Sequence, residues 1–185
     1  MGSIPIRVAI FYFRSMKPLE PPDSHHVNAA QGWLGLGDPH EATVELEKVG
    51  LELRGHPEVL ELRWQICAKE QKWQECLELA EVLFTAEPNY PGSWICRAYA
   101  LRRVPGGGLA AAQICLREGH QRFPQEPIIA YNLACYACQL GDLPEARKWL
   151  KRASALGSVS AIKQLALNDA DLEPLWAEIA ETPTK

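Results

Sequence analysis

A period of about 34 residues runs through most of this chain and constrains its fold more than any other feature. Prolines keep the period with separations of 34 and 36 residues: Pro57, Pro91 and Pro127. Small residues keep it with separations of 34, 36 and 34: Ala42, Cys76, Ala112 and Ala146. Because both series share one register, the sequence predicts four repeats, with an insertion in the third. A unit that recurs at this spacing buries its apolar face only by stacking on its neighbours.

Each repeat reads as a helix, a tight turn and a second helix. In the fourth repeat, Gly141 is expected to adopt the left-handed conformation that ends the first helix. Asp142 is then expected to cap the second helix, with Glu145 completing a capping box. Gly37 and Asp38 repeat this chemistry in the first unit. Because the turn residues agree with the period, local and long-range signals both predict an all-α fold.

The fourth unit also carries small and bulky residues at fixed offsets from Pro127: Ala134, Gly141, Ala146, Leu150 and Ala153. This pattern resembles the tetratricopeptide repeat (TPR), and the matching units span about 23–56, 57–90, 91–126 and 127–157. Trp64 departs from the pattern by replacing a small residue, while Arg63 and Arg97 occupy a position that is usually apolar. The resemblance covers roughly residues 23–157 and implies a right-handed α-solenoid of about four helix-turn-helix units.

The two ends of the chain differ from the repeats. Residues 158–185 are predicted to form capping helices at 158–167 and 169–181, and "DLEPLW" is similar to an ending that follows some bacterial TPR arrays. The second helix carries an amphipathic stripe: Leu172, Leu175, Trp176 and Ile179. Residues 1–22 are expected to be an arm and linker. Within them, residues 1–15 are either a strand-like arm that docks on the body or a partner, or vector- or upstream-derived sequence before a start at Met16.

The charge and the cysteines limit the classes of function. Lys and Arg total 19 against 23 Asp and Glu, giving a net charge of −4 with both signs interspersed. A nucleic-acid or polybasic membrane protein would carry a basic face, so neither kind of partner is expected. The six cysteines lie in helix-like stretches without a compact framework. They therefore indicate free thiols in a reducing, cytoplasmic compartment.

The pair Cys135 and Cys138 has a spacing that can serve metal or redox chemistry. A structural zinc site needs four ligands, and no second such pair or suitably spaced histidine pair accompanies these two cysteines. A redox pair normally lies at a helix N-terminus, whereas this one falls in the later part of its helix. We expect packing or groove-lining thiols, with thiol-based redox or metal-responsive chemistry as the alternative. No catalytic residue, metal site or cofactor is expected, and the chain is predicted not to be an enzyme.

The TPR resemblance implies that the first helices of the units line a concave groove where a protein or peptide partner lies. The residues expected there are Glu61, Gln65, Lys69, Tyr99, Arg102, Arg103, Tyr131, Asn132, Cys135, Cys138 and Gln139. Arginine forks beside tyrosines suit a carboxylate or an acidic peptide. Alternatively, Arg102 and Arg103 only stabilise a helix C-terminus. The expected function is a non-catalytic scaffold or adaptor that binds a peptide or helix. A self-associating structural module is a further alternative, and the partner and oligomeric state stay open.

Overall fold

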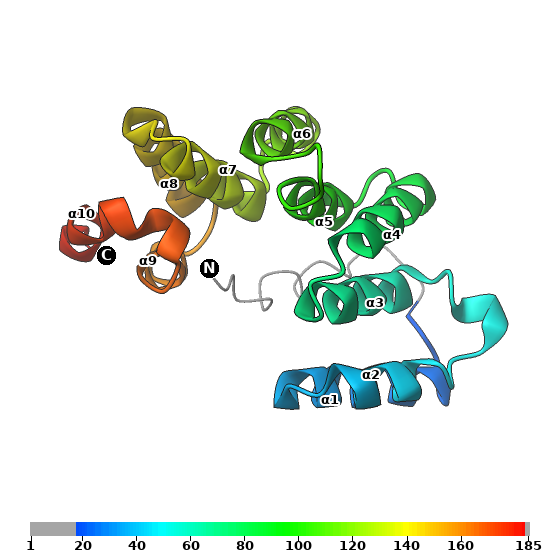
Figure 1. The fold of residues 1–185 in the computed structure, drawn as a ribbon. Coiled ribbons are helices and arrows are strands. Elements are labelled where there is room, and N and C mark those ends of the chain that lie inside the picture. Colours follow the sequence, from blue (N-terminus) through cyan, green and yellow to red (C-terminus); the bar gives the residue numbers. More distant parts are fainter. Residues whose placement is uncertain (1–17, 184–185) are drawn as a thin grey trace. The chain divides into compact units, whose positions relative to one another are not determined.

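A computed structural model describes residues 18–183, which are helical and contain no strand (Figure 1). The helices are α1 (Asp23–Leu36), α2 (Pro39–Leu46), α3 (Pro57–Lys69), α4 (Trp73–Ala86), α5 (Pro91–Leu101), α6 (Leu109–Arg122), α7 (Pro127–Gln139), α8 (Leu143–Leu156), α9 (Val159–Leu167) and α10 (Trp176–Glu181), with 3₁₀ helices η2 (Leu51–Leu53) and η3 (Ala170–Leu175). The predicted all-α fold is confirmed. The predicted arm at residues 1–15 lies outside the described residues.

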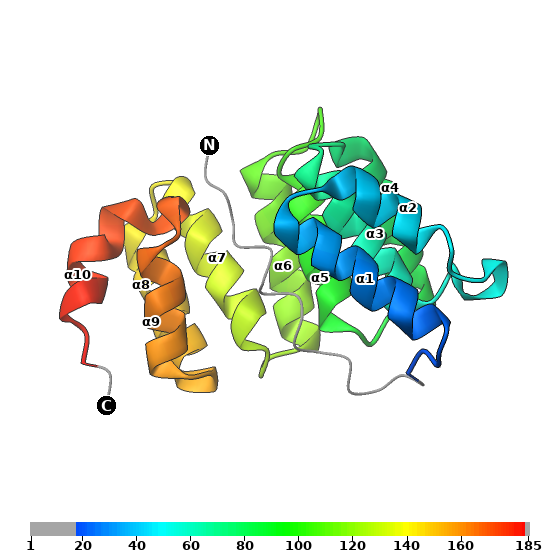
Figure 2. The same cartoon turned by 90° about the horizontal axis from the view of Figure 1, so that it is seen from below.

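The described helices form two compact bodies, divided between Val104 and Pro105. In the first, α1 pairs with α2 and α3 with α4, and α5 packs on α4. In the second, α6 and α8 both pack on α7, and α9 packs on α8 (Figure 2). The third unit predicted from the sequence contributes α5 to the first body and α6 to the second.

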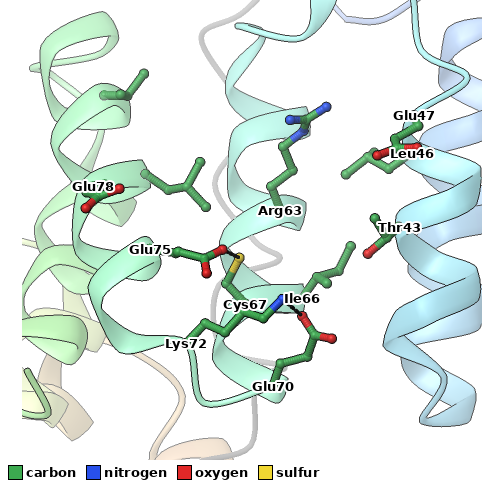
Figure 3. Close-up of a pocket in the computed structure, with 12 residues that line it drawn as sticks. Thr43, Leu46, Glu47, Arg63, Ile66, Cys67, Glu70, Lys72, Glu75 and Glu78 are labelled. Carbon is green, nitrogen blue, oxygen red and sulfur yellow. Dashed lines mark hydrogen bonds and ion pairs between the residues drawn. The ribbon is translucent and has the colours of Figure 1, made fainter.

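In the first body, α2 is shorter than the second helices of the other units. It has 8 residues, whereas α4, α6 and α8 have 14 each. Long-range bonds end it early: Arg54 Nη2 donates to the Glu47 carbonyl at 2.7 Å, and the Gly50 N–H donates to Asp23 Oδ1 at 2.7 Å. A hollow lies beside its C-terminal end, between α2, α3 and α4 (Figure 3).

The predicted turn chemistry is confirmed at both ends of the repeat series. Gly37 and Gly141 both take the left-handed conformation, with φ of 90° and 82°. Asp38 accepts a hydrogen bond from the Glu41 N–H at 3.0 Å, which caps α2. Glycine is favoured at these two turns because an L side chain is strained at such a positive φ.

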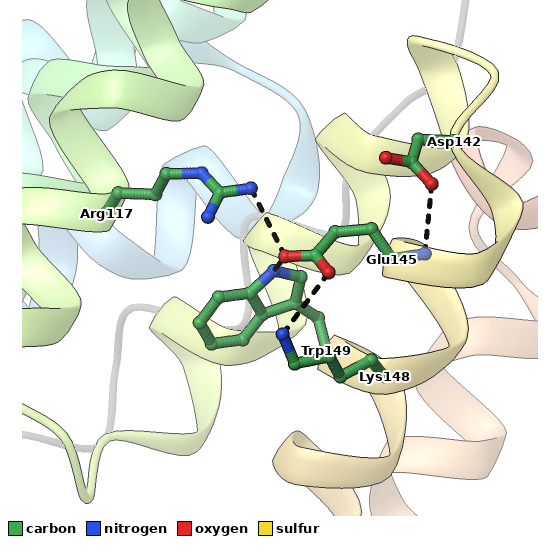
Figure 4. Close-up of polar contacts among 5 residues, drawn as sticks. All are labelled: Arg117, Asp142, Glu145, Lys148 and Trp149. Atoms are coloured by element: carbon green, nitrogen blue, oxygen red, sulfur yellow. Dashed lines mark hydrogen bonds and ion pairs between the residues drawn. The ribbon is translucent and has the colours of Figure 1, made fainter.

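Glu145 forms only one of the two hydrogen bonds of the predicted capping box. Its N–H donates to Asp142 Oδ1 at 3.1 Å, as expected. Its carboxylate instead accepts from Trp149 Nε1 at 2.8 Å and from Arg117 Nη2 at 3.2 Å (Figure 4). The Asp142 N–H donates to the Ala137 carbonyl. The guanidinium outcompetes a backbone N–H for the carboxylate because a hydrogen bond between charged groups is stronger. The side chain therefore ties α6 to α8 rather than closing a cap.

The C-terminal segment folds back in two steps. The sequence predicted one helix over 169–181, but residues 170–175 form the 3₁₀ helix η3, which contains Pro174, and α10 begins only at Trp176. Leu172, Leu175 and Ile179 from the predicted stripe are buried. None of the helices in residues 18–183 combines the length and apolar character that crossing a bilayer requires.

Candidate functional site

The first-helix face of the first body contains six of the eleven expected groove residues. Glu61, Gln65 and Lys69 follow one another along α3, and the first two are buried while Lys69 is exposed. Tyr99 lies near the end of α5, with Arg102 and Arg103 directly after its last turns, and all three are half-buried. Trp64 on α3 meets Tyr99 on α5 edge to face, with ring centroids 5.6 Å apart. This contact joins the two helices below the expected binding face.

Glu61 is held by a contact that sequence reasoning missed. It is 2 % exposed, and the Tyr90 hydroxyl donates to its Oε2 at 2.7 Å. The Tyr90 ring lies where a side chain at residue 92 would start, since a Cβ added to Gly92 would collide with it. Burial raises the pKa of Glu61 to about 7, although the bond from Tyr90 acts in the opposite direction. Glu61 therefore links α3 to the start of α5 and is not an open groove contact.

An arginine stacked on two aromatic rings forms the half-open part of this face. The guanidinium carbon of Arg103 lies 3.7 Å from the Tyr99 ring centroid and 4.8 Å from that of Trp73, and Nη1 donates to the Tyr99 carbonyl at 3.1 Å. A guanidinium stacked in this way is weakly hydrated and fixed in orientation, so it loses little freedom when it binds a carboxylate. Trp73 was not expected at this site. Trp64, which replaces a small residue of the repeat pattern, was the sequence signal for the aromatic cluster of Trp64, Trp73 and Tyr99.

In the second body, the other five expected residues lie on α7, and the chain's own C-terminal segment bonds three of them: Tyr131, Cys135 and Gln139. Tyr131 donates its hydroxyl to Asp169 Oδ2 at 2.8 Å, and Gln139 Nε2 donates to the Asp171 carbonyl at 3.1 Å. Asn132 bonds its own helix at the Ile128 carbonyl (2.9 Å). Tyr131, Asn132, Cys135 and Cys138 are buried. Here a segment containing two aspartates occupies the first-helix face.

The two cysteines of this helix are protonated thiols in a buried setting. Burial, and then the nearby Asp169, raises the pKa of Cys135 well above its usual value, and burial raises that of Cys138. The thiolate is the form that attacks disulfides and binds metals, so these shifts disfavour both kinds of chemistry. Within residues 18–183, the His, Cys, Asp and Glu side chains form no group of three or more that is placed to hold a metal ion.

The hollow beside α2 is a second candidate site, with a volume of about 390 Å³. Its floor comes from α3 and its walls from α2 and α4 (Figure 3). The Arg63 side chain extends into it, and its Nε atom is buried with no hydrogen-bond partner among the described residues. The sequence pattern indicated Arg63 as a charged residue at a usually apolar repeat position. The sequence pattern did not predict the short α2 that opens the hollow.

No protein-family model matches the sequence, and no curated protein matches it either. Among solved structures, the chain is similar to a thermophilic TPR protein from Thermus thermophilus. The TM-score is 0.57 at 18 % sequence identity, and the match covers 86 % of this chain and 100 % of that one. Because the identity is low, the likeness concerns the fold, and it confirms the resemblance inferred from the repeat period. The chain is a helical-repeat protein with the TPR fold.

Proposed function

We propose that this chain is a non-catalytic scaffold that binds an acidic peptide or helix of another protein on the first-helix face formed by α3 and α5. Extended binding surfaces are the usual way in which stacked helical repeats act. The candidate contacts are Lys69, Tyr99, Arg102 and Arg103, with Trp73 beside them. The buried Glu61 and Gln65 support this face from below.

The observation that carries the proposal lies in the second body, where the chain binds a segment of itself. Asp169 and Asp171 rest against α7, the first helix of its pair, through the Tyr131 and Gln139 side chains. This contact supports the proposal, because a segment with two acidic residues lies against a first-helix face, with the Asp169 carboxylate bonded to Tyr131 and the Asp171 backbone carbonyl bonded to Gln139. The face formed by α3 and α5 carries Lys69, Arg102 and Arg103 at the C-terminal ends of these helices, where α7 carries Gln139. These cations suit an acidic ligand.

The stacked Arg103 gives this face a fixed recognition group. Its guanidinium is already positioned against Tyr99 and Trp73, and so the side chain need not be ordered when a ligand arrives. An acidic ligand would add a bond between charged groups at this point, and nearby aromatic rings would exclude water from it. We expect the affinity to fall as the salt concentration rises.

The test is selection of a random peptide library on the immobilised protein, followed by affinity measurements with the selected peptides. Asp- and Glu-rich peptides should emerge, and Arg103→Gln should weaken them about tenfold, or about 1.4 kcal/mol. Lys151→Gln is the matched control, because it removes one exposed positive charge from α8. A selected pool without acidic residues, or equal affinity for wild type and Arg103→Gln, would refute the proposal.

A further inference from the structure

The early end of α2 leaves part of the second unit uncovered. In the repeat register, Leu46 at the end of α2 corresponds to Ala80 in α4, so the last six residues of α4 have no counterpart in α2. Six helical residues span about 9 Å. Val82 lies in this stretch and is 51 % exposed, and it lines the hollow together with Arg63. The hollow is thus a cleft at the place where a longer α2 would cover α3 and α4.

The residues that line the cleft follow helical spacing on both α3 and α4. On α3 and its C-cap residue they are Arg63, Ile66, Cys67 and Glu70, and on α4 they are Glu75, Glu78, Leu79 and Val82. Each set recurs at i, i+3, i+4 and i+7, which forms one stripe along a helix. Two such stripes bordered by the end of α2 form a groove of the kind that receives an amphipathic helix.

The charges of the cleft define the chemistry of its occupant. Lys72 pairs with Glu70 at 3.0 Å. Glu47, Glu75 and Glu78 pair with no cation among residues 18–183. Four glutamates against two cations, Arg63 and Lys72, line the cleft, so it carries a net negative charge beside its apolar residues, and complementary charge on a partner would be basic.

We propose that this cleft receives an amphipathic helix of a partner protein, with an apolar stripe against Ile66, Leu79 and Val82 and basic side chains toward Glu47, Glu75 and Glu78. The Arg63 guanidinium on the floor takes a hydrogen-bond acceptor of that helix, such as a side-chain carboxylate or a carbonyl of its last turn. The site is separate from the first-helix face of α3 and α5, and it does not depend on that face binding anything.

The experiment uses a displayed library of single helices, randomised on one face and selected on the wild-type protein. The expected pool has Lys or Arg flanking apolar residues at i, i+3, i+4 and i+7. Glu78→Lys should weaken a selected peptide about tenfold or more. Glu118→Lys is the matched control, with the same charge change at an exposed position on α6, and it should bind within about twofold of wild type. Thermal unfolding of each variant verifies that the fold is retained.

Cys67 supplies a second, independent readout because its side chain lines the cleft. It is half-buried, whereas the other five cysteines are buried. A bulky maleimide attached at Cys67 should abolish binding of the selected helix, and the bound helix should slow that labelling. Cys67→Ser should bind normally after the same treatment.

Three results would overturn the proposal. One is a pool that is acidic or non-helical, and another is equal loss of binding in Glu78→Lys and Glu118→Lys. The third is a concentration-dependent dimer in sedimentation that Glu78→Lys dissolves, because a second copy of this chain would then occupy the cleft. Arg103→Gln should leave binding of the helix unchanged, which separates this cleft from the first-helix face of α3 and α5.

Discussion

A single buried carboxyl group makes part of this fold sensitive to pH. Glu61 lies between α3 and the start of α5, and burial raises its pKa from 4.5 to about 7. The fold therefore favours the protonated acid. The stabilisation is fully present below about pH 4.5, the pKa of the unfolded chain, and it is lost as the pH rises through about 7. The shift corresponds to about 3 kcal/mol.

Replacement of Glu61 by glutamine should remove this dependence. Glu61→Gln keeps an oxygen that accepts the Tyr90 hydroxyl and carries no proton to lose. Between about pH 5 and about pH 8, we expect the wild-type free energy of unfolding to fall by up to about 3 kcal/mol more than that of the variant. Urea unfolding at several pH values measures the difference. Glu118→Gln, at an exposed position, should follow the wild-type profile, and parallel profiles for wild type and Glu61→Gln would disprove the assignment.

At the scale of helices, the local signals predicted where most helices begin and end. Gly37, Gly141 and the capping aspartates act within a few residues, so their effect is visible in the sequence. The end of α2 depends on Arg54 and Asp23, which bond groups 5 to 27 residues away from them in the chain. Such partners are chosen by tertiary packing, and no helix signal in the sequence reveals them. The cleft beside α2 was unpredictable for that reason.

The candidate groove was predictable only in part for a related reason. Periodicity placed Tyr131 and Cys135 on the correct helix face, but it carries no information about what covers that face. The cover comes from residues about 34 to 38 positions later, through Asp169. Likewise, the Glu61 pair with Tyr90 depends on an aromatic residue 29 positions away. Faces of helices follow from spacing, while their burial follows from long-range contacts.

Asp169 should be the most sensitive position of the C-terminal segment. It is 1 % exposed, and its carboxylate accepts from the Tyr131 hydroxyl at 2.8 Å and from the Asp171 N–H at 3.0 Å. Asp169→Ala leaves both donors buried without an acceptor, which should lower the free energy of unfolding by about 2–3 kcal/mol. Hydrogen exchange should quicken across η3 and α10. Glu173→Ala, an exposed change on the same segment, should stay within about 0.5 kcal/mol. Unchanged exchange in Asp169→Ala would contradict this role.

At the scale of the whole molecule, the eight helices expected for the four units are present as α1 to α8, but they are grouped into two bodies. The boundary falls at Val104 and Pro105, next to the glycines in which the sequence placed its insertion. Gly106 and Gly108 both have positive φ there, at 79° and 116°. An insertion within a repeat lengthens the link between its two helices, so the third unit is where the array divides.

Limited proteolysis with subtilisin tests this division. The first cut between residues 18 and 183 should fall within 104–108, because exposed glycine-rich links bind readily in a protease active site. The link at 50–56 should be cut later, since Gly50 and Arg54 bond it to neighbouring segments. Mass spectrometry identifies the site, and circular dichroism should find both fragments helical. A first cut at 50–56 or inside a helix would contradict the prediction.

The segment at residues 169–171 has a consequence for competition among ligands. Because it belongs to the same chain as α7, to which α8 and α9 connect it, it acts as a competitor at a roughly millimolar effective concentration. A free acidic ligand present at micromolar levels, with a similar intrinsic affinity, would be outcompeted at α7 about a thousandfold. At α7, an intramolecular ligand therefore excludes acidic partners that are present only at micromolar levels.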